Sequence, residues 1–309
     1  MTRAVIDIGT NSVKLLVAEV SHKVVPLLDL SEQTRLGRGF YETKILQPEA
    51  IAATAKVVAD FKHQAERFSP ASTKVVATSA AREAKNQAEF ISAIQEACGC
   101  PVQIITGDQE AEWVFLALCS YPQLHSSPLL VMDIGGGSTE FIYGENGQLL
   151  FKKSFPIGSV RLYEQLAVDD PPAPRQLAES QQWMSSFFQS NIPVELQNFL
   201  QPHPAKRIQM AATGGTATIL ARLKLQMPRF EVEKIDALVL SQTSVHQMTE
   251  MLWSLSLSQR QDLPFLPRKR ADIILMGALI FSQAMKFFGM SEIFISTRGL
   301  RHGAVLSGA

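Results

Sequence analysis

Cysteine is scarce in this chain of 309 residues, and its three cysteines (Cys98, Cys100 and Cys119) show neither a C-x-x-C pair nor another metal-ligand spacing. This pattern argues against a disulfide framework and against a zinc site. No apolar run approaches the ~18 residues that span a bilayer, and the first residues lack the pattern of a secretory signal. We therefore expect a cytoplasmic protein without a membrane segment.

An excess of charge of either sign is also absent, because Lys+Arg and Asp+Glu both number 29. A polyanionic partner must then be held by a local basic groove rather than by bulk attraction, and we expect no nucleic-acid partner. The six histidines show no H-E-x-x-H spacing, and no G-x-S-x-G elbow is present, which excludes the zinc protease and serine hydrolase patterns. Hydrophobic residues make up 46% of the chain, as in an ordinary globular protein.

Short β-type runs alternate with longer helical runs along the chain, which is typical of α/β folds. In the first half we expect strands at 3–9, 13–20, 23–29, 74–78 and 102–106, and helices over 48–68, 80–98 and 108–119. In the second half we expect strands at 128–134, 138–144, 148–155, 207–212 and 292–296, and helices at 159–167, 174–200, 216–225, 242–256, 268–288 and 299–306.

The two halves repeat a motif as well as an order of elements. The segment V-I-D-I-G-T-N-S from Val5 aligns with V-M-D-I-G-G-G-S from Val131, so that Asp7 matches Asp133 at a spacing of 126 residues. A repeat of this kind predicts two α/β domains, 1–119 and 120–309, the second with helical insertions. We expect a ligand-binding cleft between the domains.

Three glycine-containing turns could each cradle a phosphate. Glycine lets backbone N–H groups converge on an anion, and hydroxyl or amide side chains add donors. Any one of these turns alone is more easily an ordinary turn, but three together favour phosphate binding. The candidate phosphate-binding residues are Gly9, Thr10, Asn11 and Ser12; Gly135, Gly136, Gly137 and Ser138; and Gly214, Gly215 and Thr216.

Carboxylates accompany the first two turns. Asp7 and Asp133 each end an apolar strand, and Glu140 follows the second turn. Carboxylates placed in this way can hold Mg²⁺ between the protein and phosphate oxygens, so we predict Mg²⁺ as cofactor and these three residues as its ligands. The alternative is an aspartate that only closes its own turn by side-chain hydrogen bonding.

Segments spread over the whole chain resemble the exopolyphosphatase and guanosine pentaphosphate phosphatase family, within the sugar kinase, chaperone and actin superfamily. They are A-V-I-D-I-G-T-N-S (4–12), R-L-G-R-G (35–39), T-S-A-A-R-E-A (78–84), I-T-G-D-Q-E-A (105–111), D-I-G-G-G-S-T-E (133–140), G-G-T-A-T (214–218), R-A-D-I-I-L-M-G-A-L-I (270–280) and G-L-R-H-G (299–303). The resemblance implies two duplicated actin-like, ribonuclease H-like domains.

The same resemblance implies the catalytic residues Glu110, Arg82 and Asp133, with Glu140 as a second acidic residue. The implied activity is removal of terminal orthophosphate from inorganic polyphosphate or guanosine pentaphosphate by an enzyme that forms a homodimer. The chemistry agrees, because an in-line water needs a carboxylate to activate it and cations to neutralise the phosphate oxygens. Taken alone, Glu110 and Arg82 would be ordinary helix residues.

Four positions depart from the family pattern. Gln109 and His302 stand where glutamate is usual, and Arg38 and Lys269 stand where acidic residues are frequent. Basic segments at 152–153, 268–270 and 298–301 could line a path for a longer polyanion, although solvated surface charge is the alternative. Two other functions remain open at this point: an ATP-dependent kinase or chaperone of the same superfamily, and a non-catalytic sensor of polyphosphate or guanosine tetraphosphate.

Overall fold

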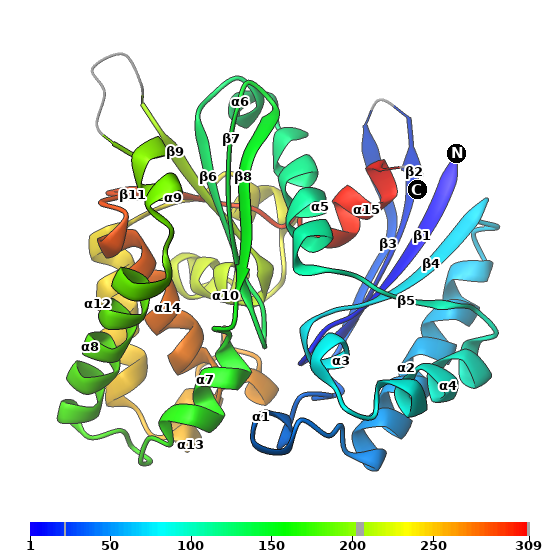
Figure 1. The fold of residues 1–309 in the computed structure, drawn as a ribbon, viewed down its shortest axis with the longest axis horizontal. Coiled ribbons are helices and arrows are strands. Elements are labelled where there is room, and N and C mark those ends of the chain that lie inside the picture. Colours follow the sequence, from blue (N-terminus) through cyan, green and yellow to red (C-terminus); the bar gives the residue numbers. More distant parts are fainter. Residues whose placement is uncertain (22, 202–206, 308–309) are drawn as a thin grey trace. The chain divides into compact units, whose positions relative to one another are not determined.

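The computed structural model describes residues 1–21, 23–201 and 207–307. The chain divides into two compact units: Met1–Ser120 with Arg298–Ala309, and Tyr121–Thr297 (Figure 1). The predicted boundary after residue 119 lies next to this division. The chain from Arg298, which the sequence analysis assigned to the second domain, joins the first unit instead, because α15 (Leu300–Leu306) packs against α5 (Gly107–Cys119).

The first unit is built on a five-stranded sheet in the order β3-β2-β1-β4-β5. Its strands are β1 (Thr2–Ile8), β2 (Val13–Val20), β3 (Val24–Glu32), β4 (Ser72–Ala77) and β5 (Val102–Ile104). β1 pairs antiparallel with β2 and parallel with β4. Helices α2 and α4 lie on one side of the sheet, and α5 and α15 lie on the other (Figure 1). The helices besides α5 and α15 are α1 (Phe40–Thr43), α2 (Pro48–Glu66), α3 (Ser79–Glu83) and α4 (Gln87–Cys98).

The second unit is built on a six-stranded sheet in the order β10-β11-β9-β6-β7-β8. Its strands are β6 (Leu129–Ile134), β7 (Thr139–Glu145), β8 (Gln148–Phe155), β9 (Gln209–Thr213), β10 (Val239–Ser241) and β11 (Glu292–Ile295). Its helices are α6 (Pro122–His125), α7 (Ser159–Leu166), α8 (Pro174–Asn191), α9 (Val194–Phe199), α10 (Gly214–Leu225), α11 (Val232–Asp236), α12 (Gln242–Ser254), α13 (Leu257–Gln261) and α14 (Ile274–Phe287), with a 3₁₀ turn, η1, at Arg268–Arg270.

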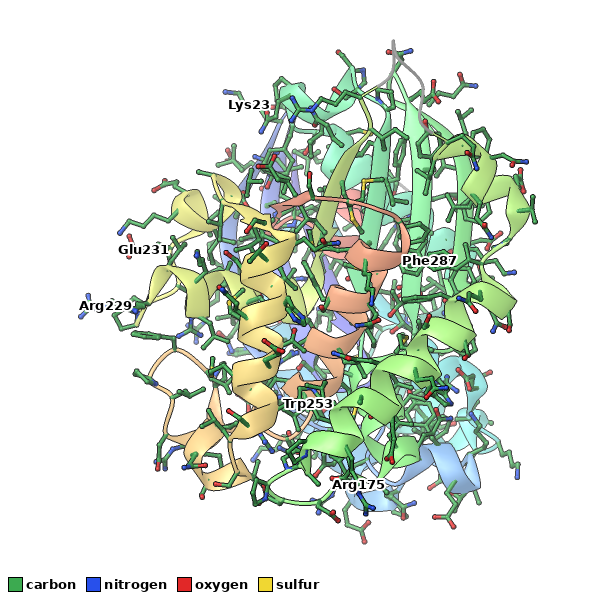
Figure 2. The ribbon with its side chains drawn as sticks, turned by 90° about the vertical axis from the view of Figure 1, so that its left-hand side faces the viewer. Lys23, Arg175, Arg229, Glu231, Trp253 and Phe287 are labelled. Carbon is green, nitrogen blue, oxygen red and sulfur yellow. The ribbon has the colours of Figure 1, made fainter. Side chains whose placement is uncertain are left out.

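The core of the second unit surrounds α14, in which every residue from Ile274 to Met285 is buried. A helix that is apolar on all sides must be covered on all sides, which explains the densest hydrophobic stretch of the sequence. Trp253 of α12 lies in this core and donates its indole N–H to the carbonyl of Leu275 at 3.1 Å, whereas Arg229 and Glu231 point outward (Figure 2). Among the described residues, no helix is both long and apolar enough to cross a bilayer.

The two sheets confirm the internal repeat. In each unit a first strand pairs antiparallel with the second and parallel with the fourth. An irregularity between Val17 and Ala18 in the β2–β3 pair recurs between Tyr143 and Gly144 in the β7–β8 pair. A strand irregularity at matching positions of both copies indicates a duplicated architecture, because bulges are set by the local fold.

Several expected helices are divided in the structure. The helix expected over 80–98 ends at Glu83 and restarts at Gln87, where the side chain of Asn86 exchanges hydrogen bonds with the backbone of Leu46 at 2.9 and 3.0 Å. The helix expected over 174–200 ends before Pro193, since proline disfavours helical backbone in the residue before it. The helix expected over 268–288 begins only at Ile274, after the 3₁₀ turn.

Candidate functional site

The first glycine turn connects β1 to β2 and is closed by its own backbone. The amide of Gly9 donates to the carbonyl of Ser12 at 3.0 Å. The carbonyl of Thr10 accepts from Gly37 at 2.7 Å, so the R-L-G-R-G segment is attached directly to the turn. Thr10, Asn11 and Ser12 are all buried. A turn fixed in this way presents its N–H groups at constant positions, as an anion site requires.

The second glycine turn connects β6 to β7 and repeats this closure, with the Gly135 amide donating to the Ser138 carbonyl at 2.9 Å. The start of α7 supports it from outside. The Arg161 amide donates to the Gly136 carbonyl at 3.1 Å, and its guanidinium Nε donates to the Gly137 carbonyl at 2.7 Å. Arg161 is only 6% exposed, and it is a supporting residue that the sequence analysis missed.

The third glycine turn begins α10 and brings two charged groups together. Gly214 has a φ of 92°, and a Cβ there would lie 2.5 Å from Asp133 Oδ1. A Cβ at Gly215 would lie 2.2 Å from Arg270 Nη1. A side chain at either position would displace the Asp133 carboxylate or the Arg270 guanidinium from the N-terminus of α10, a position that favours anions.

Arg270, which the sequence analysis considered only as part of a basic path for a polyanion, lies at the third glycine turn. Burial lowers the pKa of its guanidinium to about 10, and Asp272 opposes this shift. The group stays cationic near neutral pH. The R-A-D motif was the signal available in the sequence, but only folding places it beside Gly215. Thr216, which we predicted to contact phosphate, is buried with its hydroxyl against Gly277 of α14, and a contact with phosphate stays a prediction.

Strand register distinguishes the carboxylates of the two units. Residues directly opposite each other in an antiparallel pair share one face of the sheet. Asp7 is opposite Lys14, whereas Asp133 is opposite Glu140. Burial raises the pKa of Asp7, opposed by Lys14 and Arg301, and its Oδ1 has no hydrogen-bond partner among the described residues. The first unit thus pairs its carboxylate with a cation, and the second unit places two carboxylates together.

The carboxylates of the second unit are suited to a magnesium ion that also binds substrate, rather than to a metal ion enclosed by protein ligands alone. Glu140 is 1% exposed, and its Oε1 accepts from the Ser154 hydroxyl at 2.6 Å. The described part of the chain holds no group of three or more His, Cys, Asp or Glu side chains suited to a metal ion. Mg²⁺ is commonly bound by one or two carboxylates together with substrate phosphates. Asp133 and Glu140 match that donor set.

Glu110 and Arg82, which only the family resemblance indicated, lie side by side in the first unit. The Thr106 side chain caps α5 by accepting from the Gln109 amide at 3.1 Å, and Glu110 follows in the first turn. Arg82 Nη1 donates to Glu110 Oε2 at 3.4 Å and to the Ile105 carbonyl at 2.8 Å. Glu110 is only 8% exposed. Its carboxylate is therefore oriented by a guanidinium that is itself fixed to the backbone.

One of the basic segments expected to contact a polyanion is largely occupied inside the first unit. Arg301 donates to the Leu15 carbonyl at 2.7 Å and to Asp29 Oδ1 at 2.6 Å. Arg298 donates to the Ser120 hydroxyl at 2.8 Å. These cations hold α15 and the segment before it against the rest of the unit. Arg268 is bonded in a similar way, to Asp262 Oδ1 at 3.1 Å, and a polyanion path along the basic segments stays a prediction.

Comparison with known proteins gives the family. The model of the Ppx/GppA phosphatase family matches residues 15–309. The chain is 28% identical to Exopolyphosphatase 2 of Mycobacterium tuberculosis over 98% of this chain and 97% of the relative. It is 29% identical to a bifunctional 3-dehydroquinate synthase/phosphatase of Fusobacterium nucleatum over 99% of this chain, a match that covers 46% of that longer protein.

Solved structures agree. The Ppx/GppA family member of Aquifex aeolicus superposes with a TM-score of 0.81 at 29% identity, covering 100% of this chain and 97% of that one. An exopolyphosphatase from Cytophaga hutchinsonii superposes with a TM-score of 0.88 at 25% identity, covering 100% and 99%. The predicted actin-like α/β fold is confirmed, and the chain belongs to the Ppx/GppA phosphatase family.

Proposed function

We propose that this protein is a phosphohydrolase that releases terminal orthophosphate from inorganic polyphosphate, using a water molecule activated by Glu110. Membership of a phosphatase family, with exopolyphosphatases among its relatives, supports hydrolysis of a phosphoanhydride as the reaction class. The observation that carries the proposal is the contact of 3.4 Å between Arg82 and Glu110. It joins a nearly buried carboxylate to a cation of the type that binds phosphate.

Glu110 acts as the general base in this proposal. An ionised carboxylate can accept a proton from water as the oxygen attacks phosphorus, and a fixed orientation makes that transfer efficient. The hydrogen bonds of Arg82 to Glu110 and to the Ile105 carbonyl hold the carboxylate in one orientation. The remaining guanidinium N–H groups can neutralise charge on the equatorial phosphate oxygens.

The glycine turns and Arg270 hold the phosphate chain in this proposal. The turns that begin at Gly9 and Gly135 are rigid, and the third lies at the N-terminus of α10, where N–H groups point outward. Arg270 adds a positive charge beside Gly215. The non-bridging oxygens of a polyphosphate carry negative charge along the whole chain, so polyphosphate matches backbone donors and a guanidinium better than a neutral ligand does.

Mg²⁺ is part of the proposal, with Asp133 and Glu140 as the residues that hold it and Asp7 as a further candidate. When bound, the ion would neutralise charge on the phosphate oxygens. The two carboxylates share one face of the β6–β7 pair, and the Ser154 hydroxyl orients Glu140. Asp7 is the weaker ligand because Lys14 already offsets its charge.

Polyphosphate is favoured over guanosine pentaphosphate because we find no sequence feature that specifies guanine, whereas the phosphate-binding features serve both substrates. Guanosine pentaphosphate remains the second candidate substrate. The predictions of a homodimer and of a cytoplasmic location are untested and stay predictions.

The proposal is tested by measuring phosphate release from long polyphosphate, tripolyphosphate, guanosine pentaphosphate and ATP, with and without Mg²⁺. We expect release from long polyphosphate that stops on chelation and returns with added Mg²⁺. We also expect Asp133→Asn to raise the Mg²⁺ concentration needed for half-maximal rate. Turnover without Mg²⁺ would contradict the proposed role of the metal ion. Hydrolysis of ATP and of no other substrate would contradict the assignment of polyphosphate as the substrate.

A further inference from the structure

Arg260 is a buried arginine that the proposed mechanism does not use. It lies on α13 and is only 3% exposed. A buried guanidinium is costly unless its N–H groups find acceptors. Here Nε donates to the Ala271 carbonyl at 2.8 Å, Nη1 donates to the Leu255 carbonyl at 2.5 Å, and Nη2 lies 3.8 Å from Asp170 Oδ1. The guanidinium thus joins three segments of the second unit.

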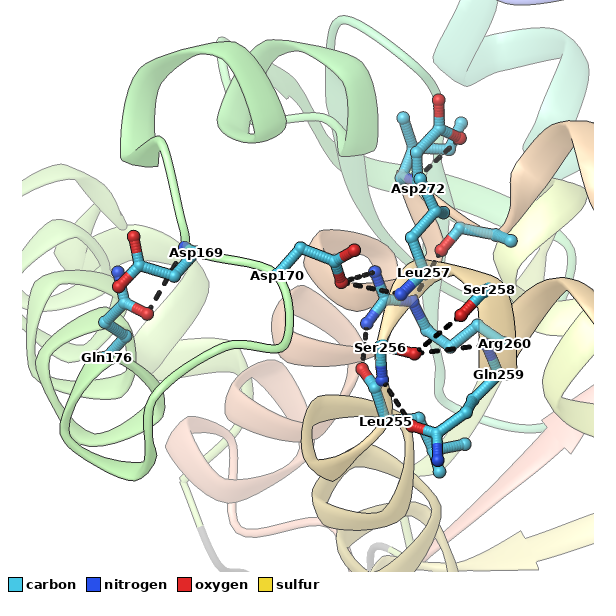
Figure 3. A network of polar contacts seen from close by, with 12 residues as sticks. Asp169, Asp170, Gln176, Leu255, Ser256, Leu257, Ser258, Gln259, Arg260 and Asp272 are labelled. Carbon is cyan, nitrogen blue, oxygen red and sulfur yellow. Dashed lines mark hydrogen bonds and ion pairs between the residues drawn. The ribbon is translucent and has the colours of Figure 1, made fainter.

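The start of α13 is itself fixed, so Arg260 is attached to a rigid base (Figure 3). Asp170 Oδ1 accepts from the Leu257 amide at 2.6 Å. Ser256 and Gln259 form a capping box, in which the Ser256 hydroxyl accepts from the Gln259 amide and the Gln259 side chain accepts from the Ser256 amide at 2.8 Å. A fixed donor can hold its acceptor in one position.

The acceptor that matters is the Ala271 carbonyl, because Ala271 directly follows Arg270. The turn before it is closed by short-range backbone bonds, from Arg270 to Pro267 at 2.8 Å and from Ala271 to Arg268 at 3.2 Å. The Arg260 Nε–H ties the end of this turn to another element at that carbonyl. The Arg270 guanidinium then lies against Gly215 at the N-terminus of α10.

We propose that Arg260 is a positioning residue: by holding the Ala271 carbonyl it fixes the 268–272 turn and so places the Arg270 guanidinium at Gly215. The inference rests on the proposed function for its consequence, which is phosphate binding at that place. Lysine cannot replace this arginine, since a single ammonium lacks the planar fork that reaches Ala271 and Leu255 together.

The test is a double-mutant cycle on kcat/KM for tripolyphosphate, with Arg260→Lys, Arg270→Gln and the double variant. We expect Arg260→Lys to lower kcat/KM about tenfold in the wild-type background, because a small displacement of a positioned group is costly. In the Arg270→Gln background the same change should alter kcat/KM by less than about twofold, since the group being positioned is gone. Additive losses, or an unchanged kcat/KM for Arg260→Lys, would overturn the inference.

Two further variants separate positioning from folding. Ser241→Ala removes the side-chain cap of α12, which lies outside this network, so it should lower thermal stability and leave kcat/KM within about twofold. If Arg260→Lys does not fold, Asp170→Asn weakens the same network from its other side and should show the same coupling to Arg270. A loss of kcat/KM in Ser241→Ala as large as that in Arg260→Lys would mean that general loosening explains the effect.

Failure of the proposed function leaves a different signature. If the wild-type protein hydrolyses none of the phosphoanhydrides, the proposed function is contradicted. The double-mutant cycle is then measured on the affinity for tripolyphosphate, determined by calorimetry. Non-additive losses of affinity then support the positioning role of Arg260. Additive losses, or a wild-type protein that does not bind tripolyphosphate, contradict it.

Discussion

His302 is a buried histidine at a position where the resembled family commonly has glutamate. Burial lowers its pKa to about 3, the neighbouring Arg301 and Arg298 add to this shift, and Asp29 opposes it. The side chain is therefore neutral in the folded protein at any ordinary pH. We interpret it as part of the packing of α15 rather than as a ligand.

A pH-dependent contribution to stability follows from this environment. The unfolded histidine titrates near its ordinary pKa of 6.5, so below that value the unfolded state binds a proton that the folded state excludes. The contribution is complete above about pH 6.5 and is lost as the pH falls toward about 3, by at most ~1.4 kcal/mol per pH unit.

His302→Gln should remove that dependence. The difference in unfolding free energy between wild type and variant is measured by urea denaturation from about pH 4.5 to about pH 8. We expect the difference to grow in favour of the wild type as pH rises to about 6.5 and to stay level above it. A difference that is independent of pH would show that the folded state also accepts the proton.

Single residues also show which features of the site could not be predicted from the sequence. The repeat identified Asp7 and Asp133 as equivalent, but the contrast between Lys14 and Glu140 as their partners emerges only when the strand register is known. The R-A-D motif drew attention to Arg270, but its place beside Gly215 could not be predicted, because the two residues are distant in sequence. Arg82 and Glu110 were indicated only through family resemblance, since both residues look ordinary on their own helices, and the contact between them emerges only from the structure.

At the scale of elements, the turn at the start of α10 depends on two residues without a side chain, Gly214 and Gly215. Gly215→Ala would place a methyl group where the Arg270 guanidinium now lies, 2.2 Å from Nη1. Because a guanidinium is the far end of a flexible side chain, the fold should survive while Arg270 moves. We expect kcat/KM to fall by about tenfold or more with little change in melting temperature.

The matched control is Gly99→Ala at the end of α4. Gly99 has a φ of 66°, and a methyl group there would meet no atom of the described residues within 4 Å, so the substitution strains the backbone without displacing a neighbour. It should cost about 1 kcal/mol of stability and leave kcat/KM unchanged. If Gly215→Ala keeps full activity, the proximity of Arg270 to this turn has no role in catalysis.

Element prediction succeeded where patterns were long and failed where local interactions interrupt them. The central strands were found because their buried residues are consecutive and mostly apolar. Pro193 was a visible signal for the end of α8 that the expected helix over 174–200 ignored. The break at Asn86 could not be foreseen, because its cause is a pair of hydrogen bonds to Leu46 in a distant segment.

At the scale of the whole molecule, zero net charge makes local cations decide the affinity for a polyanion. Each phosphate that a cation neutralises releases condensed counterions, by analogy with nucleic-acid backbones. We expect the effect to involve the basic segments that the sequence analysis singled out, among them Lys152–Lys153 and Arg268–Arg270. Long polyphosphate should therefore show a KM that rises more steeply with salt than that of guanosine pentaphosphate.

Lys269→Glu tests that account, with Lys56→Glu as a control of equal charge change at an exposed position of α2. KM for both substrates is measured across a salt series. Lys269→Glu should reduce the salt slope for polyphosphate by about one or more, and Lys56→Glu should not. Equal slopes for the two substrates, or a higher kcat/KM for guanosine pentaphosphate throughout, would reverse the preferred substrate.

The central claim is that Glu110 activates the attacking water while other groups hold the phosphates. The most direct measurement is phosphate release from long polyphosphate by wild type and Glu110→Gln, with affinity determined separately by calorimetry. The account predicts that turnover falls by about two powers of ten or more while affinity stays almost unchanged, because glutamine keeps the shape and loses the base. Lost affinity with unchanged turnover would contradict it and make Glu110 a binding residue.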